Sequence, residues 1–289
     1  MMGRDFTVES SLRQDDHRTQ FRDAASVANA LTRMYGAEFG QPVAKPEIIH
    51  VMAVWQRGDD YITLRINQDT PKSDRDFFVL NAARARADAI VTTGRILRDE
   101  PDLVHDLDGP GQTGSGLAAW RRDILGKPEP PHVLILTSGR GIPGASDPPR
   151  PDCSVADWHP AVRGWARPII YTTETTAAAL RGREGDRIRV VGAESPGLRS
   201  AIVYLRDQLG CRTISIEAGP STVRDLYNDP VLVDELLLSV FHGKRVPDSV
   251  RGAPFIPSET VAAMFARTAP AFSLTEPSGP WRFHRLVRT

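Results

Sequence analysis

The sequence has few of the residues that mark a redox or metal-binding protein. Only two of its 289 residues are cysteine, Cys153 and Cys211, and neither lies in a CxxC pattern or at a Cys/His ligand spacing. They could pair only if the fold brought them together, and two reduced thiols are the favoured interpretation. The seven histidines are scattered singly along the chain, so we expect no metal site.

Net charge is also lacking. The chain has 36 Lys and Arg residues against 36 Asp and Glu residues, and its formal charge is zero. This balance argues against binding nucleic acid through bulk electrostatics, which needs a net basic face. Only four of the basic residues are lysine and 32 are arginine. A local arginine cluster that binds a phosphate therefore stays open as an interpretation.

Long apolar runs are missing as well. No run reaches the roughly 18 to 20 apolar residues that span a bilayer, and the polar N-terminus lacks the apolar segment of a secretory signal. We therefore predict a cytoplasmic protein with no membrane partner. Residues 1–46 are predicted to form a polar arm, one helix over residues 20–35 and a Gly/Pro linker, ahead of a main domain at residues 47–289.

From residue 47 onward, short apolar runs alternate with segments of helical pattern. Buried strands are expected at residues 48–54, 89–93, 132–137, 168–172, 187–191, 213–217 and 236–240. Helices are expected after Ser73, whose spacing to Asp76 fits a capping box, over residues 197–209, and from Pro220. The alternation predicts an α/β fold with a mostly parallel central sheet and helices on both faces. A period-two pattern over residues 272–275 and 281–287 predicts an antiparallel C-terminal hairpin.

Two long connections interrupt this series, residues 104–131 and residues 139–167. Loops of that length in a compact domain are usually functional or partly disordered. The glycine-rich run at residues 111–116 lies inside the first connection and follows no predicted strand, so we interpret it as a linker.

Three predicted strands end in segments that contain glycine, hydroxyl groups or arginine. The segments are Thr93–Pro101, Ser138–Arg140 and Ala218–Thr222. In open α/β sheets ligands bind at the carboxyl ends of the strands, and these residue types are the components of phosphate sites. No P-loop is present, and no GxGxxG lies at a strand-to-helix junction. The arginines have an equally good interpretation as solvated surface residues.

The segments ARADAIVTTGRILRDEPDL, HVLILTSGR and TISIEAGPSTVRDLYNDPVLVDELLLSV, in this order and spacing, resemble the reductase domain of the riboflavin-biosynthesis deaminase–reductases, the RibD C-terminal family. The resemblance covers the chain from about residue 47 to the C-terminus. It implies a dihydrofolate-reductase-like fold, an NADPH cofactor and reduction of the ribosylamino group of a pyrimidine ribotide by hydride transfer. It also implies a homodimer. The His-x-Glu and Pro-Cys-x-x-Cys signatures of the zinc deaminase domain are absent, so we expect no deaminase activity.

The resemblance also assigns roles to individual residues. Glu217 is the implied catalytic residue, and it would hold the ribosyl chain or polarise the imine being reduced. The alternative is a carboxylate bonded to neighbouring backbone N–H groups. The implied substrate-binding residues are Arg84, Leu103 and Glu217. The implied cofactor-binding residues are Thr93, Gly94, Arg95 and Asp99 after one strand, Ser138 and Arg140 at the 2′-phosphate, and Gly219, Pro220, Ser221 and Thr222 at the pyrophosphate.

The chain departs from the family pattern at four places, one of which is the loop expected from Gly94 to Pro101, which is one residue shorter than usual. Where the first strand usually ends in Ser-Leu-Asp-Gly, Arg57 stands near the place of the aspartate. Ala218 replaces a glycine, which predicts a methyl group intruding on the dinucleotide. Asp106 stands where the family has an arginine, and it would repel a substrate phosphate. Two functions therefore stay open: an NADPH-dependent reductase of a small pyrimidine- or pterin-like substrate, and a reductase-like binding or scaffold protein that has lost catalysis.

Overall fold

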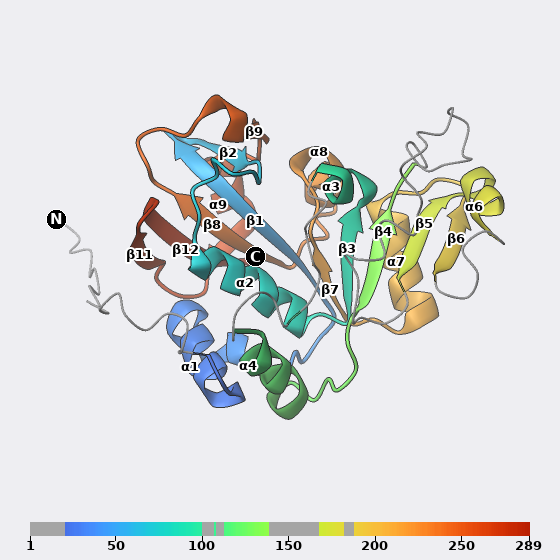
Figure 1. Cartoon of the computed structure of the whole chain (residues 1–289), viewed down its shortest axis with the longest axis horizontal. Coiled ribbons are helices and arrows are strands. Elements are labelled where there is room, and N and C mark those ends of the chain that lie inside the picture. The colour runs from blue at the N-terminus through green and yellow to red at the C-terminus, as the bar shows by residue number, and fades with distance from the viewer. Residues whose placement is uncertain (1–20, 100–106, 108–112, 139–167, 182–187) are drawn as a thin grey trace.

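A twelve-stranded sheet forms the centre of the protein. The computed structural model describes residues 21–99, 107, 113–138, 168–181 and 188–289 (Figure 1). The main path of the sheet runs in the order β10-β12-β8-β1-β7-β3-β4-β5-β6. The predictions for Leu103, Asp106, Arg140 and Cys153 fall outside the described residues. Within the described part, no helix is both long enough and apolar enough to span a bilayer.

Seven neighbouring strands of this sheet are parallel, as the alternating pattern predicted. Each predicted buried strand is present within a few residues of its expected bounds. Their bounds are β1 (Glu47–Arg57), β3 (Ala89–Thr93), β4 (His132–Leu136), β5 (Ile169–Thr173), β6 (Arg189–Ala193), β7 (Thr213–Ile216) and β8 (Glu235–Phe241). Every residue of β3, β7 and β8 is buried, because helices cover both faces of the sheet.

Antiparallel strands complete the sheet at one side. β12 (Gly279–Arg288) pairs with β8, and both β10 (Phe265–Arg267) and β11 (Phe272–Glu276) pair with β12. The predicted C-terminal hairpin is thus confirmed. The sequence patterns did not predict β2 (Asp60–Leu64), which folds back on β1, or β9 (Arg251–Pro254), which pairs with β2.

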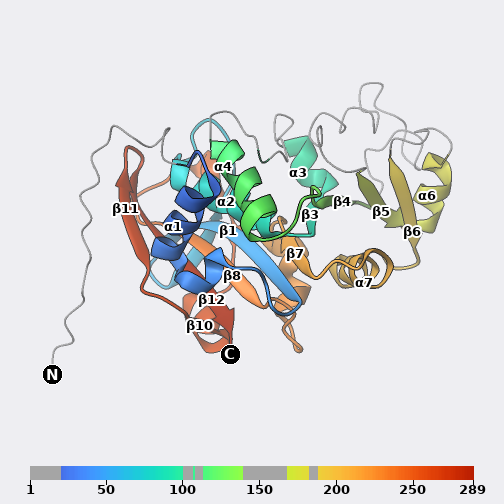
Figure 2. The ribbon, with the colours of Figure 1, turned by 90° about the horizontal axis from the view of Figure 1, so that it is seen from below.

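Two large apolar cores lie on the two faces of the sheet, and a smaller cluster includes Ile135 and Ile170. Figure 2 shows α1, α2, α4 and α7 among the helices that cover the sheet. One face carries α1 (Ala24–Tyr35), η1 (Ala37–Gly40), α2 (Asp74–Arg86), α4 (Thr113–Ala119) and the short π-helix η2 (Trp120–Ile124). The other carries α7 (Leu198–Leu209), α8 (Pro220–Val223), η5 (Arg224–Tyr227) and α9 (Ser258–Met264). The remaining short helices are α3 (Gly94–Asp99), α6 (Glu174–Leu180) and η6 (Asp248–Val250).

The first long connection is not a loop in its second half, so the linker interpretation of residues 111–116 was wrong for the part that the structure describes. Residues 113–124 form α4 and η2, and Leu117 and Trp120 are fully buried beside α1. Gly116 lies against the backbone carbonyl of Phe21, where a side chain would collide. Gly116, one of the glycines that pointed to a linker, is therefore needed for close helix packing.

The N-terminal helix packs on the same core as α4. It begins at Ala24 rather than at residue 20, because the Asp23 carboxylate accepts the backbone N–H of Ser26 at 2.7 Å and caps the helix. Val27, Leu31 and Met34 are buried on its inner face. The division of the chain at residue 46 stays a prediction.

A buried charge network stands at the amino ends of β1 and β8. Arg86 contacts Glu47 at 3.1 Å and Glu235 at 3.2 Å, and Arg285 contacts Glu235 at 2.9 Å. Both guanidinium groups also lie near the ring of Phe39, which follows α1 in η1. This network joins α2, two strands and the N-terminal segment.

The network should make stability depend on pH. Burial raises the pKa of Glu47 to about 7, against the opposing effect of Arg86. The folded protein therefore holds this proton more tightly than the unfolded chain, whose carboxyl has its ordinary pKa of 4.5. The stabilisation is complete below about pH 4.5 and is lost as the pH rises through about 7.

We expect the free energy of unfolding to fall by up to about 3 kcal/mol as the pH rises from 5 to 8, because the Glu47 carboxyl group loses its proton over this range. Urea unfolding at several pH values, for the wild type and for Glu47→Gln, isolates this contribution from those of other titrating groups. The variant should have the shallower loss of stability toward pH 8. Glu194→Gln, at an exposed position after β6 and outside the network, serves as the matched control. Equal pH dependence of wild type and Glu47→Gln would contradict the assignment.

Candidate functional site

The three polar strand ends meet at one edge of the sheet. β7, β3 and β4 are adjacent and parallel, so their carboxyl ends lie side by side. Glu217 follows β7, Gly94 follows β3 and Ser138 follows β4 within two residues. Figure 1 shows α3 at the carboxyl end of β3 and α8 at the carboxyl end of β7. The predicted clustering of these segments is therefore present in the fold.

An ion pair between Glu217 and Arg84 lies at the centre of this edge. Arg84, on α2, donates from Nε to Oε1 and from Nη2 to Oε2 of Glu217, both at 2.7 Å. A third bond joins Arg84 Nη1 to Asn81 Oδ1 at 3.1 Å. The Arg84 side chain is fully buried, and 9% of the Glu217 side chain is exposed. Two parallel bonds of this kind fix both groups in one orientation.

The fold brings together two residues that the sequence named separately. The Glu217 carboxylate is bonded to a guanidinium group on another element, α2, and Arg84 also donates to Asn81. The two interpretations of Glu217, a group that holds or polarises the substrate and a carboxylate bonded to neighbouring backbone N–H groups, both stay predictions. The carboxylate is slightly exposed at the carboxyl end of β7.

The turn after β7 leaves its backbone open. Glu217 N–H donates to the carbonyl of Val91 at 2.8 Å, which fixes the chain to β3. Gly219 then stands at the N-cap of α8, and a Cβ built on it would meet no atom within 4 Å. The side chain of Ser221 is exposed and that of Thr222 is half-buried. The phosphates of a dinucleotide would have room to approach this backbone.

Ala218 does not intrude on that space. It is 4% exposed and belongs to the apolar core under α7 and α8. Its methyl group packs inside the protein, so the steric obstacle predicted from the missing glycine was wrong. Only the next residue, Gly219, has open space above its backbone at this turn.

The segment after β3 is a helix, and the loop expected there was wrong. The hydroxyl of Thr93 accepts the backbone N–H of Ile96 at 3.3 Å, which caps α3, and Gly94 is buried. Arg95 and Asp99 are highly exposed and pair with one another at 3.3 Å, one helical turn apart. An exposed pair of this kind contributes little to stability. The guanidinium can therefore exchange its partner for a phosphate at low cost.

At the end of β4 the structure describes only part of the predicted set. Thr137 is buried, and its N–H donates to the carbonyl of Tyr171 at 3.1 Å. Ser138 is exposed, and it is the last residue that the structure describes before residue 168. Arg140 and Leu103 lie outside the described residues, so their predicted roles stay predictions.

Sequence reasoning missed two polar contacts near this edge. Asn81 lies three residues before Arg84 on α2, and this spacing was the only signal for it. His50, on β1, is fully buried, and its Nδ1 lies 2.5 Å from the hydroxyl of Tyr227. Burial lowers the pKa of His50 to about 4, so the imidazole is neutral at neutral pH. Within the described part of the chain, His, Cys, Asp and Glu residues form no group of three that could hold a metal ion.

The arrangement defines a class of fold, an α/β protein whose polar strand ends and short helices form one ligand-facing edge. The sequence matches no protein-family model and no curated protein. Among solved structures, the chain is similar to a pyrimidine reductase-like protein of Corynebacterium diphtheriae, with 20% identity and a TM-score of 0.56 over 89% of this chain and 98% of that one.

A second similar structure is RibD of Acinetobacter baumannii, with 14% identity and a TM-score of 0.50. That match covers 88% of this chain and 60% of RibD. At such identities the likeness concerns the fold. The chain has the dihydrofolate-reductase-like fold of the RibD-type riboflavin-biosynthesis reductases, which confirms the fold that the sequence resemblance implied.

Proposed function

We propose that this protein is an NADPH-dependent reductase of a small heterocyclic substrate of the pyrimidine or pterin type. The observation that carries the proposal is the open backbone at Gly219, which follows β7, the neighbour of β3 in the sheet, and stands two residues after Glu217 of the Arg84–Glu217 pair. The fold shared with a pyrimidine reductase-like protein supports the same conclusion. The proposal includes a cytoplasmic location and a homodimer, which rest on the sequence patterns and the family resemblance.

The cofactor would lie across this edge and supply a hydride. The turn Gly219–Thr222 would bind its pyrophosphate, and Thr93, Gly94, Arg95 and Asp99 would line the neighbouring strand end. Ser138 and Arg140 would bind the 2′-phosphate. Glu217, held in place by Arg84, would accept hydrogen bonds from the substrate and orient it toward the cofactor. Leu103 would complete the substrate pocket.

A titration tests this proposal directly. Cofactor fluorescence should show saturable NADPH binding with a dissociation constant between about 1 μM and 1 mM, the usual range for enzyme ligands. Arg140→Ala should weaken NADPH binding at least about tenfold and leave NADH binding unchanged, because one bidentate contact to the 2′-phosphate is lost. Equal losses for both cofactors would refute the role of Arg140. No saturable NADPH binding up to about 1 mM would refute the reductase proposal.

A second candidate function is a reductase-like binding protein without catalysis. The observation that favours it is the end of β1, where Arg57 stands exposed in the turn to β2 near the place of the family's aspartate. The two candidates differ in turnover. A binding protein would saturate with NADPH, yet it would not oxidise NADPH in the presence of ribosylaminopyrimidine or dihydropterin substrates.

A further inference from the structure

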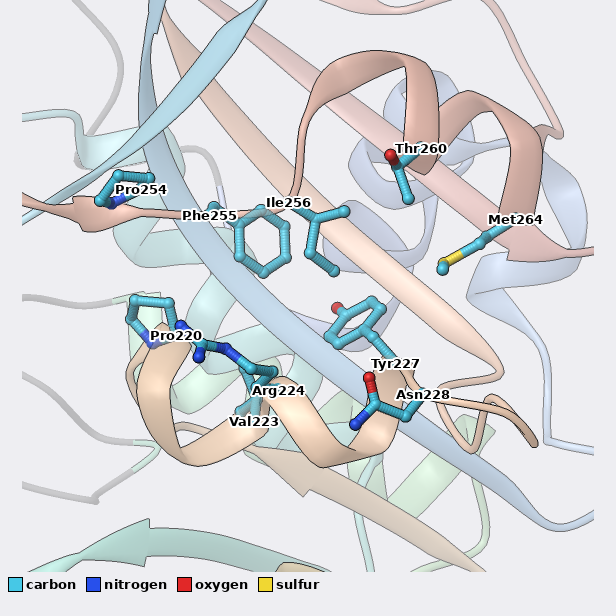
Figure 3. Close-up of a pocket in the computed structure, with 10 residues that line it drawn as sticks. All are labelled: Pro220, Val223, Arg224, Tyr227, Asn228, Pro254, Phe255, Ile256, Thr260 and Met264. Carbon is cyan, nitrogen blue, oxygen red and sulfur yellow. The ribbon is translucent and has the colours of Figure 1, made fainter.

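A ligand-sized cavity lies on one face of the helical segment that begins at the proposed cofactor turn. A cavity of about 200 Å³ separates the helical segment α8–η5 from the chain that runs from the end of β9 into α9 (Figure 3). Val223 and Tyr227 contribute apolar surface from the first segment, and Phe255, Ile256 and Met264 contribute it from the second. The cavity is therefore mostly apolar inside.

The floor of this cavity is rigid. The buried hydroxyl of Tyr227 has a hydrogen-bond partner, because it lies 2.5 Å from Nδ1 of His50. The Tyr227 ring also meets Phe255 edge-on, with centroids 5.6 Å apart, and His50 meets Phe255 in the same way at 5.8 Å. Aromatic rings held in this manner offer a preformed surface for a flat molecule.

The positively charged side chain of Arg224 lies at one end of the cavity. Arg224, the first residue of η5, lines it, and Figure 3 shows its side chain directed toward Pro220. The side chain is exposed and forms no hydrogen bond or ion pair with any residue in the described ranges. Such a guanidinium beside an apolar cavity is complementary to a molecule with one anionic group.

The cavity is distinct from the site proposed above. Its lining residues on α8–η5 are 220, 223, 224, 227 and 228, which follow helical spacing and so share one face. Ser221 and Thr222 are on other faces of that segment, and neither Glu217 nor Arg84 lines the cavity. Only Pro220 is common to this cavity and the predicted cofactor residues.

We propose that this cavity binds a small flat carboxylate, with an aromatic body against Tyr227 and Phe255 and the carboxylate on Arg224. Its volume sets the size of the ligand. An engineered cavity of about 150 Å³ accommodates benzene, so about 200 Å³ suits a single ring with one carboxylate group. The site goes beyond the proposed reductase function and does not depend on it.

Benzoate is the probe for this site, and benzyl alcohol is its uncharged control of similar shape. Saturation-transfer NMR and calorimetric titration of the full chain, without NADPH, should give a measurable benzoate affinity at least about tenfold above that for benzyl alcohol. Arg224→Met should weaken benzoate binding about tenfold. Arg282→Met removes an exposed arginine of β12 and should leave the affinity unchanged.

A cavity-filling variant tests the location independently of the charge. Met264→Trp should abolish binding of both benzoate and benzyl alcohol, and thermal unfolding shows whether that variant is folded. Unchanged benzoate affinity in Arg224→Met, or in folded Met264→Trp, would overturn the proposal. Displacement of benzoate by saturating NADPH would also overturn it, because the cavity would then belong to the cofactor site. A protein that fails to bind NADPH can still bind benzoate, so the two proposals fail separately.

Discussion

Replacing Arg84 with methionine should lower the free energy of unfolding by about 3 to 5 kcal/mol. The physical reason is that Glu217, at 9% exposure, would lose both of its 2.7 Å bonds and remain as a buried carboxylate without its counter-charge. A loss of this size is a large fraction of the stability of a typical domain. Urea unfolding of the variant against the wild type measures it.

Two further variants make this prediction specific. Arg33→Met removes an exposed arginine from α1 and should change stability by less than about 0.5 kcal/mol. The double variant Arg84→Met/Glu217→Leu should recover much of the loss, since it replaces both buried charges by apolar groups of similar size. A double variant less stable than Arg84→Met would show that the ion pair is not the cause.

Replacing Gly219 with valine should weaken NADPH binding by about a hundredfold and leave the fold intact. Gly219 has a φ of −67°, which any residue adopts, and a Cβ there would meet no atom of the described residues within 4 Å. The new side chain would instead occupy the space proposed for the cofactor phosphates. Fluorescence titration measures the affinity, and thermal unfolding measures the stability.

The matched control for this variant is Gly197→Val. Gly197 is also an N-cap glycine with no atom within 4 Å of its would-be Cβ, and it precedes α7. Both variants carry the same loss of capping preference, about 1 kcal/mol or less. Equal NADPH affinity for Gly219→Val and Gly197→Val would rule out Gly219 as the place where the cofactor approaches.

The sequence predicted the parallel strands well because the central ones, such as β3, β7 and β8, are buried on both faces and are therefore continuous apolar runs. It also predicted the cap at Ser73, whose hydroxyl accepts the backbone N–H of Asp76, and the start of a helix at Pro220. The strands β2 and β9 were not predicted from the sequence. They are short and partly exposed and lack a buried run, so only their pairing partners define them.

The contact between Arg84 and Glu217 in the candidate site could not be predicted from the sequence. Arg84 and Glu217 were both named, but 133 positions separate them, and no local pattern reports a contact over that distance. The helix α4 was hidden for a different reason. Its glycines resemble a linker, and only the neighbouring carbonyl of Phe21 explains why a helix needs Gly116.

The position of β7 has a consequence for how this protein emerges from the ribosome. β7 lies between β1 and β3 in space, yet it is synthesised after β3, β4, β5 and β6. A nascent chain that ends before residue 213 can pair those four strands with one another, but β1 has no neighbour through which to join them. The pairing that joins β1 to β3 therefore forms only after β7 has been synthesised, and Glu217 follows directly after that strand.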